Sequence, residues 1–309
     1  MHIQRGAWAE INLDAVAHNV QMAKANLKPT TKLCAVVKAD AYGHGAVRVA
    51  QEAARNGADF FAVALLQEGV KLREAGIETP ILVLGSMLPE VAEICVRYDI
   101  SHAVFDEERL YALNAAALKL HTKAKIHIKI DTGMHRIGVH VRDAGRFAKL
   151  AASLPGIYIE GVFSHFATAD ADDKQYAAYQ FERFQEALRL IEAEGVHIPI
   201  RHIANSAALT ELQEYQLDMV RQGITLYGLH PAHMIDCYKD FEPVMTVKTQ
   251  VAFVKTLPPG ETIGYGRTYT LTRPSVIATV PIGYADGVSR RLSNRGYMLV
   301  NGMKAPIIG

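Results

Sequence analysis

Short apolar segments recur along the first two thirds of the chain, and stretches with helical spacing of apolar residues separate them. The expected strands are 33–37, 60–63, 81–84, 103–105, 125–130, 158–163, 202–204 and 217–220. The expected helices are one that follows Asp14, taken as its cap, and 47–55, 67–75, 89–98, 107–118, 144–154, 175–193 and 206–214. Regular alternation of this kind predicts a (β/α)8 barrel.

A doubly wound open sheet is the alternative fold, but the glycines after Lys38 do not form the G-x-G-x-x-G pattern of such sheets. Past Phe241 the sequence alternates in the manner of β-strands, with a turn at Pro258-Pro259-Gly260. We therefore expect a barrel domain over 1–240 and a mostly β domain over 241–309, with 1–11 as a candidate extra strand of the β domain. The chain stops directly after the apolar run 306–308, so we expect this β domain to be incomplete.

Composition narrows the class of partner. The 309 residues include 33 basic and 32 acidic ones, a balance without the charge excess that binds nucleic acid or an anionic membrane. Cys34, Cys95 and Cys237 have no disulfide or zinc spacing. The first residues do not resemble a secretion signal, and no apolar run reaches the roughly 20 residues of a membrane span. These features predict a soluble cytoplasmic protein with a small-molecule ligand.

Lys38 is the strongest single candidate for chemistry. It closes the apolar run 34–37 and is followed by Tyr42 and by Gly43-His44-Gly45. Burial favours the neutral amine, which is a nucleophile for carbonyl carbon, and glycines let backbone approach a ligand. A lysine that merely reaches past the strand end into water is the competing interpretation.

Other expected strands also end in polar residues. They are Lys129-Ile130-Asp131 with Arg136 after it, Ser164-His165, Asn205-Ser206 and Arg221-Gln222-Gly223. In a barrel these ends meet at one mouth, where Ser206, Gly223 and Ile224 suit a phosphate. A phosphate beside a nucleophilic lysine indicates pyridoxal 5'-phosphate. Arg221 would then face the ring nitrogen without protonating it, which favours proton exchange at Cα over transamination.

Each of these groups also has an ordinary structural interpretation. Arg136 could be a solvated loop residue, His165 a core histidine, and Lys129 a partner for Asp131. The alternation of 126–130 instead directs Lys129 and His127 into the barrel, where Lys129 would be repelled by Arg136. Carbamylation of Lys129 by carbon dioxide would replace that repulsion by attraction.

The sequence resembles the bacterial alanine racemases along its whole length. The matching segments are WAEINLDA (8–15), AVVKADAYGHG (35–45), KIDTGMHRIGV (129–139), SHFATAD (164–170), ANSAAL (204–209), VRQGITLYG (220–228), IGYGRTYT (263–270) and PIGYADG (281–287). The lysine segment is long and specific. The resemblance implies racemisation of alanine for peptidoglycan, with pyridoxal phosphate as cofactor.

The resemblance also implies roles for individual residues. Lys38 would bind the cofactor covalently and act as the base for D-alanine, and Tyr265 would serve the opposite face of Cα. The remaining implied roles are Arg221 at the ring nitrogen, His165 positioning Arg221, Arg136 at the phenolic oxygen or substrate carboxylate, Tyr42, Ser206, Gly223 and Ile224 at the phosphate, Lys129 at the carbamate position and Tyr284 at the entry.

In this family a head-to-tail homodimer brings the β domain of one subunit, with Tyr265 and Tyr284, to the barrel of the other. The family continues beyond the equivalent of Gly309 into a loop that contributes to the substrate site. Three alternatives stay open: a chain that binds pyridoxal phosphate with little or no activity, a decarboxylase of basic amino acids, and a metal hydrolase built on carbamylated Lys129. The hydrolase would use His127, His165 and His202 as ligands.

Overall fold

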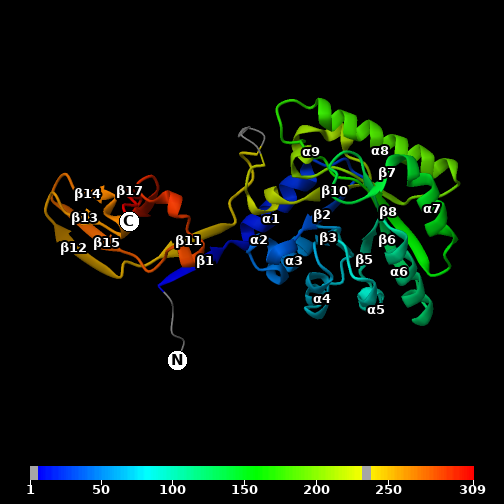
Figure 1. Ribbon diagram of the computed structural model, residues 1–309, viewed down its shortest axis with the longest axis horizontal. Helices are drawn as coiled ribbons and strands as arrows, with labels where there is room; N and C mark the ends of the chain where they lie inside the picture. The colour runs from blue at the N-terminus through cyan, green and yellow to red at the C-terminus, as the bar shows by residue number, and fades with distance from the viewer. Residues whose placement is uncertain (1–5, 232–237) are drawn as a thin grey trace. The chain divides into compact units, whose positions relative to one another are not determined.

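In the computed structural model, which describes residues 6–231 and 238–309, eight parallel strands form a nearly closed barrel within Asn12–Val244 (Figure 1). These strands are β2 (Lys32–Val36), β3 (Phe60–Val63), β4 (Ile81–Val83), β5 (Ser101–Val104), β6 (Ala124–Asp131), β8 (Ile157–Phe163), β9 (Ile200–His202) and β10 (Met219–Gln222). The expected fold class is confirmed.

Neighbouring strands pair in the order β10-β2-β3-β4-β5-β6-β8-β9, and the short strand β7 (Val139–His140) pairs with β6. The ring closes between β9 and β10 through two backbone hydrogen bonds. The Asp218 N–H donates to the Arg201 carbonyl at 3.0 Å, and the Arg221 N–H donates to the Ala204 carbonyl at 3.1 Å. All eight strands therefore direct their carboxyl ends to the same mouth.

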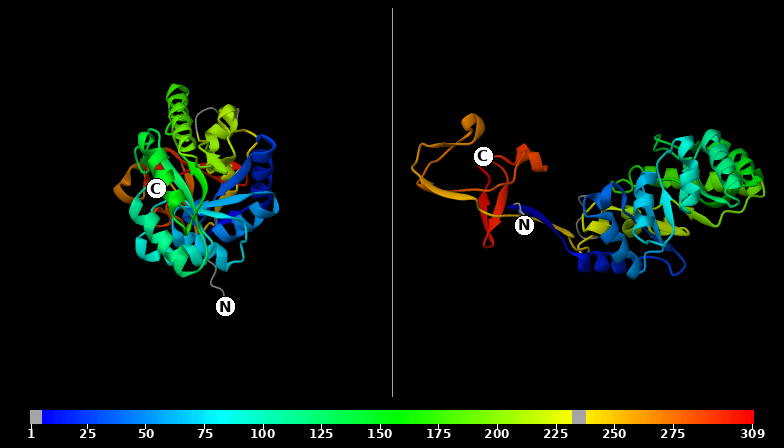
Figure 2. Two further views of the ribbon diagram at one scale, coloured as in Figure 1. Left: turned by 90° about the vertical axis from the view of Figure 1, so that its right-hand side faces the viewer. Right: turned by 90° about the horizontal axis from the view of Figure 1, so that it is seen from below.

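Helices surround these strands, as the left view of Figure 2 shows. They are α1 (Leu13–Ala25), α3 (Ala46–Arg55), α4 (Leu66–Glu74), α5 (Ala92–Arg97), α6 (Glu107–Lys119), α7 (Ala144–Ser153), α8 (Gln175–Ala193) and α9 (Ser206–Glu211), with short 3-10 turns η1 (Pro89–Val91), η2 (Val141–Asp143), η3 (Gln213–Tyr215) and η4 (Ile224–Tyr227). In α8 the buried residues Ala177, Phe184, Ala187 and Ile191 recur at helical spacing. This spacing gives one apolar face that packs on the barrel.

The start of α1 differs from the sequence expectation. Asn12, and not Asp14, is its cap: the Asn12 side chain accepts hydrogen bonds from the N–H groups of Asp14 at 3.0 Å and Ala15 at 3.3 Å. Both residue types are good caps, and Asp14 instead lies in the first turn, where its negative charge is also favourable.

Three strands also begin or end at other residues than the sequence predicts. The strand expected at 103–105 begins at Ser101, the one expected at 202–204 ends at His202, and the one expected at 217–220 runs over Met219–Gln222. Apolar runs locate a strand only where its buried residues are apolar. Here buried polar residues such as Arg221 and Gln222 belong to the strand itself.

The second unit contains the described residues up to Ile11 together with Met245–Gly309. Its strands are β1 (Ala7–Ile11), β11 (Met245–Thr249), β12 (Phe253–Leu257), β13 (Thr262–Ile263), β14 (Tyr269–Thr270), β15 (Ser275–Thr279), β16 (Tyr297–Val300) and β17 (Met303–Pro306), with 3-10 turns η5 (Tyr265–Arg267), η6 (Tyr284–Asp286) and η7 (Arg290–Leu292). Strand β1 pairs antiparallel with β11, from Ala7 opposite Thr249 to Ile11 opposite Met245.

Cys34 and Cys95 are free and buried, whereas Cys237 lies outside the described residues. Burial raises the pKa of both described thiols to about 12, so they stay protonated. Among the described residues, no helix has the length and apolarity needed to cross a membrane.

Candidate active site at the barrel mouth

Lys38 lies two residues beyond the end of β2 and is half-buried. Burial lowers the pKa of its amine, and the positive charges of Arg136 and Arg221 lower it further, while Glu68 opposes them. The neutral, nucleophilic amine is therefore present at lower pH than in an exposed lysine. The role of Lys38 as a reactive group stays a prediction.

The backbone after Lys38 forms a left-handed turn, the segment labelled α2 (Lys38–Tyr42). Residues 39–42 have φ values of 52°, 52°, 55° and 54°, a conformation that costs non-glycine residues about 1–3 kcal/mol each. Glu68 holds the turn, because its Oε1 accepts from the Ala39 N–H at 2.5 Å and its Oε2 accepts from the N–H groups of Ala64 at 2.8 Å and Leu65 at 3.0 Å.

Ser206, Gly223 and Tyr42 form a polar cradle at the same mouth. The Gly223 N–H donates to Ser206 Oγ at 2.8 Å. A Cβ added to Gly223 would lie 3.3 Å from the Tyr42 hydroxyl oxygen and 3.7 Å from Ser206 Oγ, so a side chain would fill the space between them. Ile224 begins η4 directly after this glycine. Hydroxyl and backbone N–H groups around such a space suit a phosphate.

Arg221 lies in β10 with 2% of its surface exposed. Its Nη2 donates to the carbonyls of Ser164 at 2.8 Å and Ile203 at 3.0 Å and to Nδ1 of His165 at 2.9 Å, and its Nη1 donates to Nδ1 of His202 at 2.7 Å. Burial lowers the pKa of Arg221 to about 10, so the guanidinium is charged at neutral pH. Within the described residues, its Nε–H and second Nη1–H have no partner.

His165 accepts a hydrogen bond on Nδ1, and therefore carries its proton on Nε2 when neutral. Burial, followed by the charges of Arg221 and Lys129, moves the pKa of His165 well below its ordinary value. It is a neutral ring that accepts a hydrogen bond from Arg221, and its positioning role stays a prediction.

Lys129 is buried in β6 without an anionic partner among the described residues. Its Nζ lies 4.9 Å from the centre of the Phe163 ring. Burial, together with the charge of Arg221, moves its pKa well below the ordinary value. The negative charge of Asp131 opposes this lowering of the Lys129 pKa, while Asp131 Oδ1 accepts from the N–H groups of Gly133 and His135, both at 3.0 Å.

Arg136 is exposed in the loop between β6 and β7. Its positive charge nevertheless lowers the pKa values of Lys38, Lys129 and His165. Arg136 therefore stands near these groups and is free to meet an anionic ligand.

The family comparisons agree with this geometry. The model for "Alanine racemase, N-terminal domain" matches residues 11–231, and that for "Alanine racemase, C-terminal domain" matches residues 244–309. The alanine racemase of Desulfovibrio desulfuricans is 46% identical over 305 residues, covering 99% of this chain and 82% of that protein. The alanine racemase of Halothermothrix orenii is 47% identical over 307 residues, covering 99% and 81%.

The chain belongs to the alanine racemase family. The activity of this family is the interconversion of L- and D-alanine. A solved structure of the alanine racemase of Clostridium difficile 630 matches with a TM-score of 0.94 and 39% identity, covering 100% of this chain and 81% of that one. A structure of the Bacillus anthracis alanine racemase with bound L-Ala-P matches with a TM-score of 0.92 and 38% identity, covering 100% and 80%.

Two expected site residues of the racemase family lie in the β unit. Tyr265 begins η5 between Gly264 and Gly266, which have φ values of 71° and 74°, and it is 92% exposed. Tyr284 begins η6 and is 67% exposed. Within the β unit neither hydroxyl is enclosed, so these residues are available to another surface.

The histidines expected in a metal hydrolase have other partners. His127 Nδ1 and His202 Nε2 lie 2.9 Å apart in a direct hydrogen bond, and His165 and His202 both accept from Arg221. Across residues 6–231 and 238–309, no group of three or more His, Cys, Asp or Glu side chains is arranged to hold a metal ion.

Sequence reasoning missed two carboxylates. Glu68 anchors the turn after Lys38, and its only sequence signal was an acidic residue in the first turn of a helix. Glu160 lies in β8, where a single acidic residue between Ile159 and Gly161 in an apolar strand could have been recognised as a residue with a buried partner.

Proposed function

We propose that the chain binds pyridoxal 5'-phosphate at the barrel mouth and racemises alanine with two bases, Lys38 and Tyr265. The observation that carries the proposal is the half-buried Lys38 amine, with its lowered pKa, on the same mouth as the charged Arg221. The polar cradle of Tyr42, Ser206 and Gly223 fits the phosphate group, and Ile224 would contribute its N–H there.

When bound, the cofactor withdraws electrons from Cα and makes its proton acidic. Lys38 would remove the Cα proton of D-alanine on one face, and the Tyr265 hydroxyl would deliver a proton to the other, which gives L-alanine. In the reverse direction the two groups exchange roles. A neutral phenol is a weak base, so Tyr265 needs an environment that stabilises its anion.

Arg221 would limit the reaction to proton exchange. A guanidinium donates hydrogen bonds but does not readily transfer its proton, so a ring nitrogen facing its free Nε–H or Nη1–H would stay unprotonated. His165 would keep Arg221 in place, while the exposed Arg136 would bind the substrate carboxylate or the phenolic oxygen of the cofactor.

A deuterium exchange experiment tests the activity. D-alanine would be incubated with the chain and pyridoxal phosphate in deuterium oxide, with proton NMR of the α-proton and chiral analysis of the product. Racemisation predicts loss of the α-proton and appearance of L-alanine. Lys38→Ala should abolish both, and Lys32→Ala, which changes an exposed lysine of the same strand segment, should leave them intact. A Lys38→Ala variant with the parent rate would overturn the proposal.

We also propose a head-to-tail homodimer with shared sites, in which Tyr265 and Tyr284 of one subunit serve the barrel of the other. The large exposure of both tyrosines supports this, as do exposed apolar residues of the β unit, namely Val247, Phe253, Val254, Val276 and Leu299.

A subunit-mixing experiment tests shared sites. Lys38→Ala and Tyr265→Phe chains are each expected to be nearly inactive. After unfolding and joint refolding, random pairing should restore about a quarter of the parent activity, because half the dimers are mixed and each has one intact shared site. No recovery from a mixture that forms dimers would refute shared sites.

Lys129 is proposed to be carbamylated. A neutral buried amine can attack carbon dioxide and release one proton, which yields an anion that the positive charges of Arg221 and Arg136 would attract. Extra density at Nζ in a crystal, or a rate that depends on bicarbonate, would support this. A plain lysine at full activity would contradict it.

For the cell, we propose a cytoplasmic role in supplying D-alanine for peptidoglycan.

A further inference from the structure

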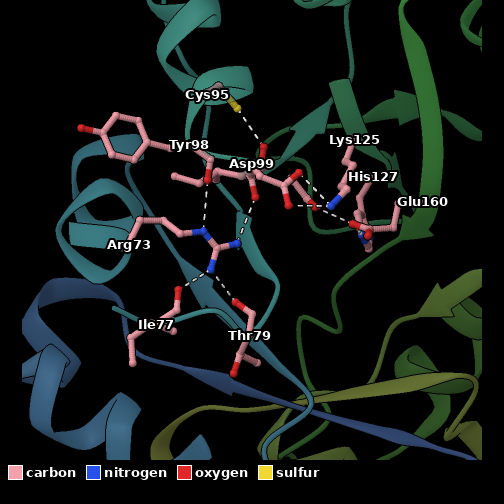
Figure 3. A network of polar contacts seen from close by, with 11 residues as sticks. Arg73, Ile77, Thr79, Cys95, Tyr98, Asp99, Lys125, His127 and Glu160 are labelled. Atoms are coloured by element: carbon pink, nitrogen blue, oxygen red, sulfur yellow. Dashed lines mark hydrogen bonds and ion pairs between the residues drawn. The ribbon is translucent and has the colours of Figure 1, made fainter. Parts of the chain in front are cut away.

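A line of polar side chains runs from Arg221 through His202 and His127 to Glu160; the first three are buried and Glu160 is partly buried. Nη1 of Arg221 lies 2.7 Å from Nδ1 of His202, whose Nε2 lies 2.9 Å from Nδ1 of His127. Nε2 of His127 lies 3.0 Å from Oε2 of Glu160. Figure 3 shows the His127–Glu160 end of this line. Both histidines are fully buried.

The direction of every hydrogen bond in this line is determined by its ends. Arginine has no acceptor, so His202 Nδ1 must be unprotonated and the ring must carry its proton on Nε2. That proton points to His127 Nδ1, which must therefore accept, and His127 carries its own proton on Nε2. This last proton is donated to Glu160, which can accept it as a carboxylate.

A charged histidine does not fit the line. A doubly protonated His127 would place a second donor against His202 Nε2–H, and a proton on His202 Nδ1 would face the Arg221 N–H. Burial, with the charge of Arg221, also moves the pKa of His202 well below its ordinary value. The positively charged Arg221 and the negatively charged Glu160 are thus connected by two neutral histidine rings, both of which are protonated on Nε2.

The backbone is shaped to admit this line. Strands β6 and β8 change register between Ile126 and His127, which brings Gly161 opposite His127. A Cβ on Gly161 would lie 2.4 Å from His127 Nδ1, so any larger residue would displace the ring. The Phe163 ring stacks on His202 at a centroid distance of 4.9 Å and an angle of 9°, which fixes the plane of that ring.

We propose that Glu160 is a positioning residue for Arg221: by accepting from His127 it sets the tautomers of both histidines, so that His202 Nδ1 remains the acceptor that holds the guanidinium. Without this carboxylate, His127 would keep its Nε2–H only as an unsatisfied buried donor. Moving the proton to Nδ1 would reverse the next bond and turn a donor toward Arg221. The effect on turnover rests on the function proposed above, whereas the tautomers do not.

The test combines ring-nitrogen NMR with kinetics. The protein would be labelled with ¹⁵N-histidine and saturated with pyridoxal phosphate. His127 and His202 should both give the ¹⁵N chemical shifts of a neutral ring that is protonated on Nε2. The signals of the two residues are assigned by their loss in His127→Gln and His202→Gln. Glu160→Leu should change the ring pattern of His202, which Glu160 does not touch. It should also lower kcat by about 10- to 100-fold, which is the range found when a residue that hydrogen-bonds to a metal-binding histidine is removed from other proteins. KM should stay within about threefold of the parent value.

Two variants separate positioning from general stabilisation. Glu160→Gln keeps an oxygen acceptor and should restore both tautomers and most of kcat. Ser101→Ala removes the other hydrogen bond to Glu160 Oε2, at 2.5 Å, and should leave the tautomers and kcat unchanged. A Glu160→Leu variant with a lower melting temperature but the parent pattern at His202 would refute the proposal.

The parent protein alone can also refute it, even if Glu160→Leu fails to fold. An Nδ1–H tautomer or a doubly protonated ring at His127 or His202 in the folded parent would exclude the deduced line. Because the ring signals do not depend on racemisation, expected tautomers in an inactive protein would refute the proposed function and leave this inference standing.

Discussion

Changing Glu68 to Gln should release the turn that follows Lys38 at one defined point. The carboxylate accepts three backbone hydrogen bonds, one on Oε1 from Ala39 and two on Oε2 from Ala64 and Leu65. A glutamine oxygen can replace Oε2. Its amide NH2 would then face the Ala39 N–H, donor against donor, so only the contact that holds the left-handed turn is lost.

The loss of stability can be estimated from the loss of this one hydrogen bond. A hydrogen bond to a charged group contributes about 1.5–3 kcal/mol to stability, and Glu68 is only half-buried, so water can partly replace it. We therefore expect a loss near the lower end, about 1.5 kcal/mol. For a domain of this size that corresponds to a fall in melting temperature of roughly 3–6 °C. The strained conformation of residues 39–42 should also relax.

Calorimetry measures the melting temperature, and the rate of Lys38 acylation, followed by peptide mass spectrometry, reports on the turn. Glu68→Gln should lower the melting temperature and change the rate of Lys38 acylation. The matched control is Glu78→Gln, which changes an exposed glutamate in the next loop and should alter neither the melting temperature nor the acylation rate. If Glu68→Gln melts within about 1 °C of the parent and Lys38 reacts at the parent rate, the turn is not held by Glu68.

Three further predictions follow from local geometry. Because burial and Arg136 lower the pKa of Lys38, its acylation rate should rise at lower pH than that of a free lysine side chain; a pH profile that coincides with that of free lysine would contradict this. Gly223→Ala should weaken binding of pyridoxal phosphate, followed by fluorescence titration, by about tenfold or more, since overpacking costs about 1–3 kcal/mol; unchanged affinity would exclude the cradle as the phosphate site. Asn12→Ala should lower the free energy of unfolding by about 1 kcal/mol, and denaturant titration should show a clearly smaller loss for Asp14→Ala.

The architecture and the mouth of the barrel could be predicted because they depend on local patterns. Alternating apolar strands and amphipathic helices can bury both faces of a parallel sheet only in a few folds, and the strand ends of a barrel share one mouth. Lys38, Ser206 and Arg221 each lie at the end of an expected strand, so their gathering followed from that fold alone.

What the chain itself determined is therefore the barrel, the β unit and the residue types gathered at the mouth, together with membership of the alanine racemase family. Tertiary structure decided that Glu68 anchors a left-handed turn and that Glu160 reaches Arg221 through two histidines. These contacts join residues far apart in sequence, and they depend on strand register and on hydrogen-bond direction, neither of which leaves a periodic signal in the sequence.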